Sequence, residues 1–437
     1  MRLRYLLALS LAATLGFRAR LPAQSGGAKA FIGARVIDGT TAAPIENATI
    51  VVRDGRIADI GPATRVTIPA DAIRTSLPGK TVIPGLVNSH GHVGDTVGLA
   101  ADRYAAENVM RDLRTYAAYG VTSVVSLGGD RAPNIAARDS QKTAGLDRAR
   151  LWAAGPVLDS AKVRIDDMVP ATPAEARTMV ADISAMKVDI IKMRVDDTLG
   201  TVKKMPPEIY RAVIDEAHKR GLRVAVHIFY LADAKAVIGA GADFIAHSVR
   251  DADVDQELIA AMKKRGVCLA PTLMREVSTF VYESTPPFFS DPLFLRHADP
   301  AAVAALKEPA RQAEMRASPA AQRYKAGLEV ASRNLKKLSD AGVTIAMGTD
   351  TGPPARFQGY FELMELEMMV KAGLTPRQAL AAATRDAARC MKIDTEVGTL
   401  QRGRWADFVA LDGDPLTSIS NVKKIDSVWI AGNRVNR

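Results

Sequence analysis

The sequence has only two cysteines, Cys268 and Cys390, in 437 residues. Two cysteines cannot form a disulfide framework, which excludes the small domains that depend on several bridges for stability. Cys268 lies in the apolar run GVCLAPTL, where we expect a buried free thiol. A single disulfide between the two cysteines is the alternative in an exported protein.

Beyond the first 24 residues, no run is long and apolar enough to predict a membrane span. Residues 1–24 combine the basic start MRLR with the apolar run YLLALSLAATLGF, and the sequence LPAQS follows. This pattern predicts a secretory signal peptide cleaved near Ala23, and therefore an exported protein, periplasmic or extracellular. Arg18 and Arg20 lie late for such a signal, so an uncleaved amphipathic anchor is the alternative.

A dense tract of basic residues is also missing, although the formal net charge is +10. Removing the four arginines of residues 1–24, a segment without acids, leaves +6. The remaining Lys and Arg residues are scattered and do not alternate with aromatic residues, so we expect no nucleic-acid partner. Hydrophobic residues make up 48% of the chain and charged residues 24%, which indicates a globular protein with a large core.

Apolar runs alternate with helical segments through the middle of the chain. The eight runs are GLVNSHGH, VTSVVSLG, RLWAAGPVL, VDIIKMRV, LRVAVHIF, DFIAHSV, VCLAPTL and TIAMGTD. Strands that are apolar throughout and separated by helices are typical of a parallel sheet covered on both faces, so this pattern predicts a (β/α)8 TIM barrel. The connection before the eighth run, residues 274–342, is long, and we interpret its aromatic part, FVYESTPPFFSDPLF, as a lid over the barrel mouth.

Both ends of the chain show a different pattern, with short alternating runs and Asp-Gly turns. KAFIGARVIDG and NATIVVRDGRIADIGP lie near the start, and WADFVALDGDP and KIDSVWIAGNRV lie near the end. These runs predict short antiparallel strands. We therefore expect residues 25–82 and 394–437 to form one small β-sandwich, and residues 83–393 to form the catalytic barrel.

Four of the six histidines fall at predicted strand ends. His90 and His92 end the first barrel strand, in VIPGLVNSHGHVGD, while His227 and His247 lie in the fifth and sixth strands. Because side chains alternate along a strand, His90 and His92 face the same side and can bind one metal ion, with Gly91 allowing close approach. A lone core histidine is more often a packed residue than a ligand, but four at three strand ends favour a metal site. His218, on a helix, and His297, in the long connection, are interpreted as structural or surface residues.

Lys192 and Asp350 complete the set of polar residues in barrel strands. Lys192 lies in DIIKMRV, where a buried ammonium costs several kcal/mol by order of magnitude. One interpretation is an ion pair with Asp196, Asp197 or another acid. The other is a neutral amine that captures carbon dioxide as a carbamate, an anionic oxygen ligand. Asp350 ends the eighth strand in AMGTDTG.

This combination of residues resembles the amidohydrolase superfamily. The resemblance rests on His-x-His, Lys, His, His and Asp on strands one, four, five, six and eight, on VIPGLVNSHGH and GTD, and on the closing GTLQRGRWADFVALDGDPL and VWIAGNRV. Within the superfamily the chain is similar to the binuclear, carboxylated-lysine branch, and to its imidazolonepropionase-like and prolidase-like group.

The resemblance implies two divalent metal ions. His90, His92 and Asp350 are then expected to hold the first ion, and His227 and His247 the second. Lys192, as N6-carboxylysine, is expected to bridge them. Zinc is the default ion for such ligands, with manganese, cobalt and iron as alternatives. Asp350 is also the expected catalytic residue, which moves a proton from the attacking water to the leaving group.

The sequence after His227 departs from the resemblance. Prolidase-like relatives usually continue with a small residue, a polar residue and Gly, whereas this chain reads HIFYLAD. Tyr230 stands where nucleobase deaminases of the superfamily tend to have a glutamate, which argues against deamination. The substrate therefore cannot be transferred from these relatives.

Three residues are candidates for substrate binding. Arg194 lies two residues after Lys192 and so should face the same side, where its guanidinium could hold a substrate carboxylate. The alternative is an ion pair with Asp166, Asp167 or Asp197. Tyr230 and Arg250 are the other two candidates.

The sequence as a whole predicts a metal-dependent hydrolase that cleaves a C–N bond in a small-molecule or short peptide substrate, as a dipeptidase or an N-acyl amino acid hydrolase does. Hydrolysis of a cyclic amide, lactone or ester is the alternative, because the same groups would serve it. A non-catalytic scaffold is disfavoured because all six ligand positions are filled. A homo-oligomer is compatible with the resemblance.

Overall fold

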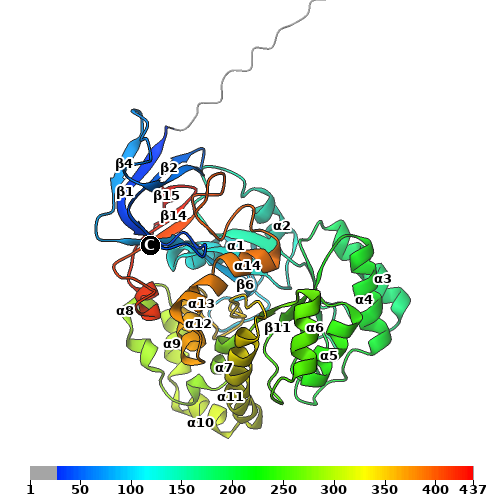
Figure 1. Cartoon of the computed structure of the whole chain (residues 1–437). Coiled ribbons are helices and arrows are strands. Elements are labelled where there is room, and N and C mark those ends of the chain that lie inside the picture. Colours follow the sequence, from blue (N-terminus) through cyan, green and yellow to red (C-terminus); the bar gives the residue numbers. More distant parts are fainter. Residues whose placement is uncertain (1–26, 437) are drawn as a thin grey trace, which may run out of the picture.

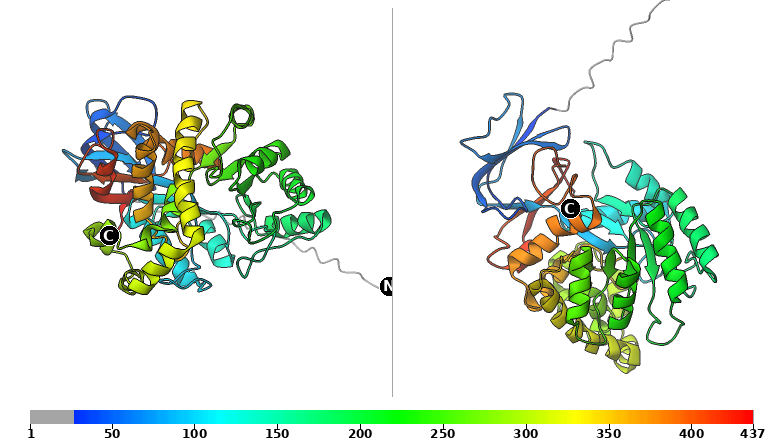
Figure 2. Two further views of the ribbon diagram at one scale, coloured as in Figure 1. Left: turned by 90° about the horizontal axis from the view of Figure 1, so that it is seen from below. Right: turned by 45° about the vertical axis from the view of Figure 1, so that its right-hand side comes forward.

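The computed structural model describes residues 27–436, and the predicted signal peptide lies outside them. The described chain forms a helix-covered barrel with a β-sandwich at one corner (Figure 1). A view from below shows the sandwich at one end of the molecule and the green helices within residues 173–265 at the other (Figure 2, left). This architecture confirms the predicted fold class, a (β/α)8 TIM barrel with a small β-sandwich. None of the helices within residues 27–436 has both the length and the apolar character needed to span a membrane.

The β-sandwich is built from both ends of the chain. Its strand order is β15-β14-β13-β5-β1-β2-β3, with β4 paired to β1. The strands are β1 Lys29–Val36, β2 Ile45–Arg53, β3 Arg56–Pro62, β4 Ile73–Ser76, β5 Thr81–Pro84, β13 Phe408–Leu411, β14 Ile425–Ile430 and β15 Asn433–Arg434. β5 joins the two ends, because it pairs in parallel with β1 and antiparallel with β13. The expected boundary between residues 82 and 83 falls inside this strand.

The barrel contains seven regular strands in two parallel sheets, β6-β7-β8 and β12-β11-β10-β9. They are β6 Leu86–Gly91, β7 Val121–Ser126, β8 Arg150–Ala153, β9 Ile191–Arg194, β10 Val224–His227, β11 Phe244–Ala246 and β12 Cys268–Ala270. The eighth predicted strand, residues 344–350, is joined to its neighbours by single bridges, Leu269 to Ile345 and Gly91 to Thr351. A third bridge joins Leu158, which lies after β8, to Met193 of β9.

Helices cover the barrel and begin and end at recognisable signals. They are α1 Ala106–Ala118, α2 Ala132–Asp139, α3 Pro173–Ala185, α4 Pro207–Lys219, α5 Leu231–Ala240, α6 Gln256–Arg265, α7 Leu273–Ser278, α8 Pro292–Leu295, α9 Pro300–Leu306, α10 Pro309–Ala317, α11 Pro319–Asp340, α12 Tyr360–Lys371, α13 Pro376–Ala382 and α14 Arg385–Met391. The Asp255 side chain accepts a hydrogen bond from the Leu258 backbone N–H at the start of α6, and Gly266 ends that helix in the left-handed conformation. Pro319 begins α11, where a missing N–H costs nothing.

The long connection between strand seven and strand eight forms its own aromatic cluster. Tyr282, Phe288 and Phe289 are buried, and Phe288 packs edge-on against Phe294 with ring centroids 5.1 Å apart. Phe289 stacks on Phe294 at 5.5 Å. These rings therefore stabilise the connection itself, and none of them lines the histidine cavity described below.

The expectation of a free thiol at Cys268 was wrong, because Cys268 and Cys390 form a disulfide. Cys268 begins β12, and Cys390 lies in α14, 122 residues later in the sequence. Both belong to a buried cluster with Phe244, Ala270 and Met391, which brings α14 against barrel strands. The sequence could not show this contact, since it depends on the path of the chain around the whole barrel.

The disulfide should contribute to stability, because it closes a loop of more than a hundred residues in the unfolded chain. We expect the double variant Cys268→Ala/Cys390→Ala to lose about 2–4 kcal/mol of unfolding free energy. Urea unfolding with and without a thiol reductant measures this loss. Reductant should destabilise the wild type and leave the double variant unchanged. Identical midpoints for all four samples would show that the bridge contributes nothing.

Candidate functional site

The first two histidines of the site lie at the carboxyl end of β6. Gly91 separates them, and a Cβ at this position would lie 2.7 Å from the Tyr116 hydroxyl oxygen, so a larger residue does not fit. His92 Nδ1 lies 2.9 Å from the Gly128 carbonyl oxygen. Because a carbonyl only accepts hydrogen bonds, this contact places a proton on Nδ1 and leaves Nε2 as the atom with a free lone pair.

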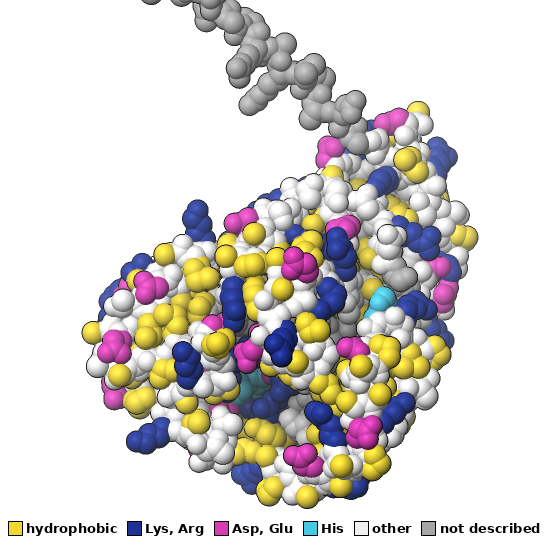
Figure 3. Space-filling model, turned by 180° about the vertical axis from the view of Figure 1, so that it is seen from behind, with side chains coloured by type: hydrophobic (Ala, Val, Ile, Leu, Met, Phe, Trp, Pro, Cys, Tyr) yellow, Lys and Arg dark blue, Asp and Glu magenta, His cyan; other side chains and the backbone are white. Residues whose placement is uncertain are grey.

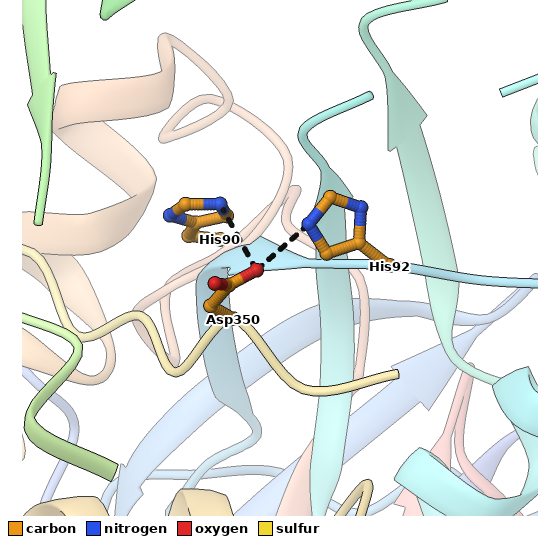
Figure 4. Close-up of side chains that lie close together, drawn as sticks. All are labelled: His90, His92 and Asp350. Carbon is orange, nitrogen blue, oxygen red and sulfur yellow. Dashed lines mark hydrogen bonds and ion pairs between the residues drawn. The ribbon is translucent and has the colours of Figure 1, made fainter. Parts of the chain in front are cut away.

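Asp350 reaches the same point from the eighth barrel segment. Its backbone N–H donates to the His90 carbonyl at 2.7 Å, which holds the two segments side by side. Its Oδ1 lies 2.8 Å from His92 Nε2 and 3.6 Å from His90 Nε2 (Figure 4). Ligand atoms of these three buried residues all lie within 4.8 Å of one another, which forms a site suited to a divalent metal ion.

His227 and His247 lie beside this group. Ring centroids are 4.7 Å apart for His90 and His247, and 4.2 Å apart for His227 and His247. The Thr272 hydroxyl lies 2.6 Å from His247 Nδ1, and Asp196 Oδ2 lies 2.6 Å from His227 Nε2. The structure thus brings together the four histidines that the sequence placed at strand ends.

Several of these residues have an unusual backbone. His247, Thr272 and Asp350 have φ angles of 75°, 49° and 59°, in the left-handed region that non-glycine residues rarely adopt. All three follow barrel strands at the edge where the histidines gather. Such conformations persist only where surrounding contacts hold them, and they concentrate at functional sites.

Lys192 lies on β9 with its side chain in the same cavity. The residue is 4% exposed, and its Nζ is buried without a hydrogen-bond partner. Burial lowers the pKa of Lys192 to about 7, so a substantial share of the amine is neutral near that pH. The alternative interpretation, an ion pair with Asp196, Asp197 or another acid, finds no such contact within the described residues.

The histidines show the same effect of burial. Burial lowers the pKa of His227 to about 3, and it holds the pKa values of His90 and His247 well below their usual range. Burial alone would raise the pKa of Asp350, but Arg356 and His90 hold it well below its usual range. The site therefore presents neutral imidazoles and an ionised carboxylate, which are the forms that bind metal ions.

A cavity of about 210 Å³ contains all these groups. It is lined by His90, His92, Leu127, Val157, Val163, Arg164, Lys192, Arg194, His227, His247, Arg275, Asp350, Pro353 and Arg356. Histidine and basic side chains are visible at the bottom of a hollow on the face opposite to that of Figure 1 (Figure 3). The lining has a strong excess of basic groups, because it contains four arginines and a lysine but only one carboxylate.

The three predicted substrate contacts are placed differently from one another. Arg194 lines the cavity, but its Nε lies 3.0 Å from Asp159 Oδ2, an acid that the sequence did not suggest as its partner. Arg250 is buried outside the lining and donates to Glu276 at 2.5 Å. Tyr230 also lies outside the lining, with its hydroxyl donating to Asp197 at 2.8 Å.

Three arginines of the lining were not predicted. Arg356 Nη1 lies 2.6 Å from Asp350 Oδ2. Arg275 contacts Glu276 at 3.2 Å, and its guanidinium stacks on Tyr324 at 4.2 Å. Arg164 Nη1 lies 3.3 Å from His92 Nδ1. All three follow barrel strands, in irregular segments or a short helix, where no sequence periodicity shows which way a side chain points.

The two remaining histidines lie apart from the site. His218 is on α4, where its Nε2 contacts Asp243 at 2.8 Å and its side chain is 40% exposed. The His297 ring packs against Tyr119 at 5.3 Å. Their positions agree with the structural or surface roles expected from the sequence.

Comparison of the sequence with known protein families identifies the family of this chain. Residues 81–435 match the model of the amidohydrolase family. The chain belongs to the amidohydrolase family. This amidohydrolase is thus a hydrolase whose barrel carries the buried His-His-Asp group typical of the family.

Individual relatives differ in what they are named for. Ochratoxinase of Aspergillus niger is 25% identical, over 89% of this chain and 83% of its own length. Imidazolonepropionase of Streptomyces avermitilis is 25% identical, over 90% of this chain and 87% of its own length. The solved structure of a Xaa-Pro dipeptidase with methionine bound in its active site superposes with a TM-score of 0.74 at 22% identity, covering 94% of this chain and all of that one.

The His-His-Asp group should make the stability of this amidohydrolase depend on metal. With zinc at about 100 times its dissociation constant, we expect the metal-stripped wild type to gain about 2.7 kcal/mol. His92→Ala should lose most of this gain because it removes a ligand. His218→Ala, a change at the exposed histidine of α4, is the matched control and should keep it.

Thermal unfolding of chelator-treated samples, with zinc returned in steps, measures the effect. An equal zinc-dependent shift in His92→Ala and His218→Ala would place the metal elsewhere.

Proposed function

We propose that this amidohydrolase is a metal-dependent enzyme that hydrolyses C–N bonds in substrates of the dipeptide or N-acyl amino acid class. The observation that carries the proposal is Lys192, a buried amine without a partner among four histidines and Asp350. An isolated buried ammonium is costly, whereas a carbamate with cations on both sides is not.

Six side chains would hold two divalent ions. His90, His92 and Asp350 would bind the first ion, and His227 and His247 the second. Lys192 would bridge them as N6-carboxylysine, formed when the neutral amine attacks carbon dioxide, makes an N–C bond and releases a proton. Four imidazoles, a carboxylate and a carbamate exceed what a single tetrahedral zinc takes, which favours two ions. Zinc is the default, as expected from the ligand types.

Hydrogen bonds to the imidazole nitrogens leave other ring nitrogens available to bind such ions. The Gly128 carbonyl and the Thr272 hydroxyl each engage Nδ1 of one histidine, His92 and His247, which leaves Nε2 of each ring for a ligand. His90 Nδ1 is buried with no partner. Asp196 orients His227. These contacts fix the rings before any ion binds.

When bound, such ions lower the pKa of a water molecule and polarise a substrate carbonyl. Asp350 would accept the proton of the attacking water and then give it to the leaving nitrogen. Arg356 holds Asp350 Oδ2 at 2.6 Å and keeps the carboxylate ionised until the proton arrives. Arg194 lines the cavity, where Asp159 pairs with its guanidinium.

The names of similar structures support C–N cleavage, since they include a Xaa-Pro dipeptidase and phenylurea hydrolase B. The deciding experiment is a hydrolysis screen of the zinc-loaded enzyme with dipeptides, N-acyl amino acids, their carboxamides and lactones. We expect turnover of at least one C–N substrate. Asp350→Asn should lower kcat at least ~10²-fold while keeping much of its metal, because Asn cannot take the proton. Turnover of lactones alone would replace the proposal with ester chemistry.

Metal stoichiometry tests the bridging lysine. We expect about two ions per chain in the loaded wild type and about one in Lys192→Ala, because the second ion would lose its bridge. Bicarbonate with a short-chain carboxylic acid should partly restore activity to the variant. Metal analysis and activity are measured on the same samples. One ion per chain in a fully active wild type rules out the bridged pair.

We also propose that the enzyme acts outside the cytoplasm. The Cys268–Cys390 disulfide supports export, because disulfides persist mainly in oxidising compartments. The predicted signal peptide would direct it there.

A further inference from the structure

Four guanidinium groups line the active-site cavity, and one of them differs from the others in its partners. Arg194, Arg275 and Arg356 each have a carboxylate within reach, at 3.0, 3.2 and 2.6 Å. For Arg164, no acid within residues 27–436 lies within the 4.0 Å of an ion pair. Its guanidinium is therefore not paired directly with a carboxylate, although Asp167 on the same loop interacts with it electrostatically.

The contact between Arg164 and His92 does not balance that charge. His92 Nδ1 donates to the Gly128 carbonyl at 2.9 Å, so it cannot also accept a hydrogen bond from Arg164 Nη1 at 3.3 Å. Two donors thus lie beside each other with no acceptor between them. An anion in this place would accept from the guanidinium and relieve the contact.

The loop that carries Arg164 is held in place by its own hydrogen bonds. Asp167 Oδ2 accepts from the backbone N–H groups of Val163 and Arg164, at 3.0 and 2.6 Å. Beyond it, the Met168 backbone N–H donates to the Val157 carbonyl at 2.8 Å. This bond holds the loop against the segment that follows β8. Arg164 is therefore presented to the cavity by a fixed loop, with Asp167 as a positioning residue.

The position of Arg164 suits one particular part of a substrate. The guanidinium lies on the Nδ1 side of the His92 ring, whereas Asp350 lies on the Nε2 side. Arg164 also lines a neighbouring hollow of about 110 Å³, which shares His92 and Pro353 with the main cavity. A group bound by Arg164 would thus lie beside the reacting bond and not at it.

We propose that Arg164 determines specificity by binding a carboxylate of the substrate next to the scissile bond. This inference rests on the proposed function, and it narrows the substrate class to free acids over their carboxamides. The planar guanidinium can donate two parallel hydrogen bonds to a carboxylate, and partial burial strengthens that pair. Arg194, already paired with Asp159, would contribute mainly to the shape of the wall.

The test compares N-acetyl-L-methionine with N-acetyl-L-methioninamide on the zinc-loaded full chain. The readout is kcat/KM where a compound is hydrolysed, and Kd from titration calorimetry where it is not. Arg164→Met should lower kcat/KM, or raise Kd, about 10- to 100-fold for the acid, which is the range of a charge-assisted hydrogen bond. For the amide the same change should be less than about threefold. Arg164→Lys keeps the charge but loses the two parallel hydrogen bonds. Its kcat/KM or Kd for the acid should therefore lie between the values of the wild type and Arg164→Met.

Arg131→Met is the matched control. Arg131 is an arginine that contacts Asp166 on the same loop but does not line the cavity, so its replacement should leave the preference for the acid intact. Zinc content and thermal unfolding verify each variant, and Arg164→Gln replaces Arg164→Met if the latter does not fold. The inference is overturned if the wild type shows no preference for the acid, or if Arg164→Met and Arg164→Gln keep it. Failure of the proposed function would give a different result. The enzyme would then bind the acid in preference to the amide, but it would hydrolyse no C–N bond.

Discussion

The backbone hydrogen bonds between β6 and the eighth barrel segment are the contact on which the site depends. Asp350 N–H donates to the His90 carbonyl, and His92 N–H donates to the Thr351 carbonyl. These bonds close the barrel and place a carboxylate from the end of the chain's barrel region against two imidazoles from its beginning. The eighth segment has too few ladder bonds to count as a regular strand, and its left-handed Asp350 shows that it bends sharply where it meets β6. The same hydrogen bonds thus close the barrel and bring the metal-binding side chains together.

Burial sets the electrostatics that follow from this closure. The barrel removes water from Lys192 and from the four histidines, and in each of these groups desolvation is the main reason that the pKa falls. The same desolvation would neutralise Asp350, and Arg356 prevents it. A single physical cause therefore yields uncharged nitrogen ligands and a charged oxygen ligand side by side. The excess of guanidinium groups around them makes the cavity receptive to anions.

The sequence predicted what depends on strand periodicity and failed where loops or long-range contacts decide. Histidines two residues apart on a strand must face one side, and parallel strands end at one edge, so the cluster around His90 could be foreseen. Arg164 and Arg356 could not, because nothing in an irregular loop tells which way a side chain points. Arg250 illustrates the opposite error: it was a candidate for substrate binding, but its charge is satisfied by Glu276 in the core. The partner of Cys268 was hidden for a similar reason, since it depends on the complete chain path.

The disulfide has a consequence for how the protein withstands cleavage. Cys268 and Cys390 enclose the long connection with the aromatic cluster, α11 and the segment that carries Asp350 in one covalent loop. A protease that cuts once between these cysteines would produce two fragments that stay linked. Both fragments would also keep their strands in the barrel, where the hydrogen bonds of β12 and the eighth segment hold them. A single cut in an exposed stretch of the long connection would therefore leave the carboxylate and the histidines in place.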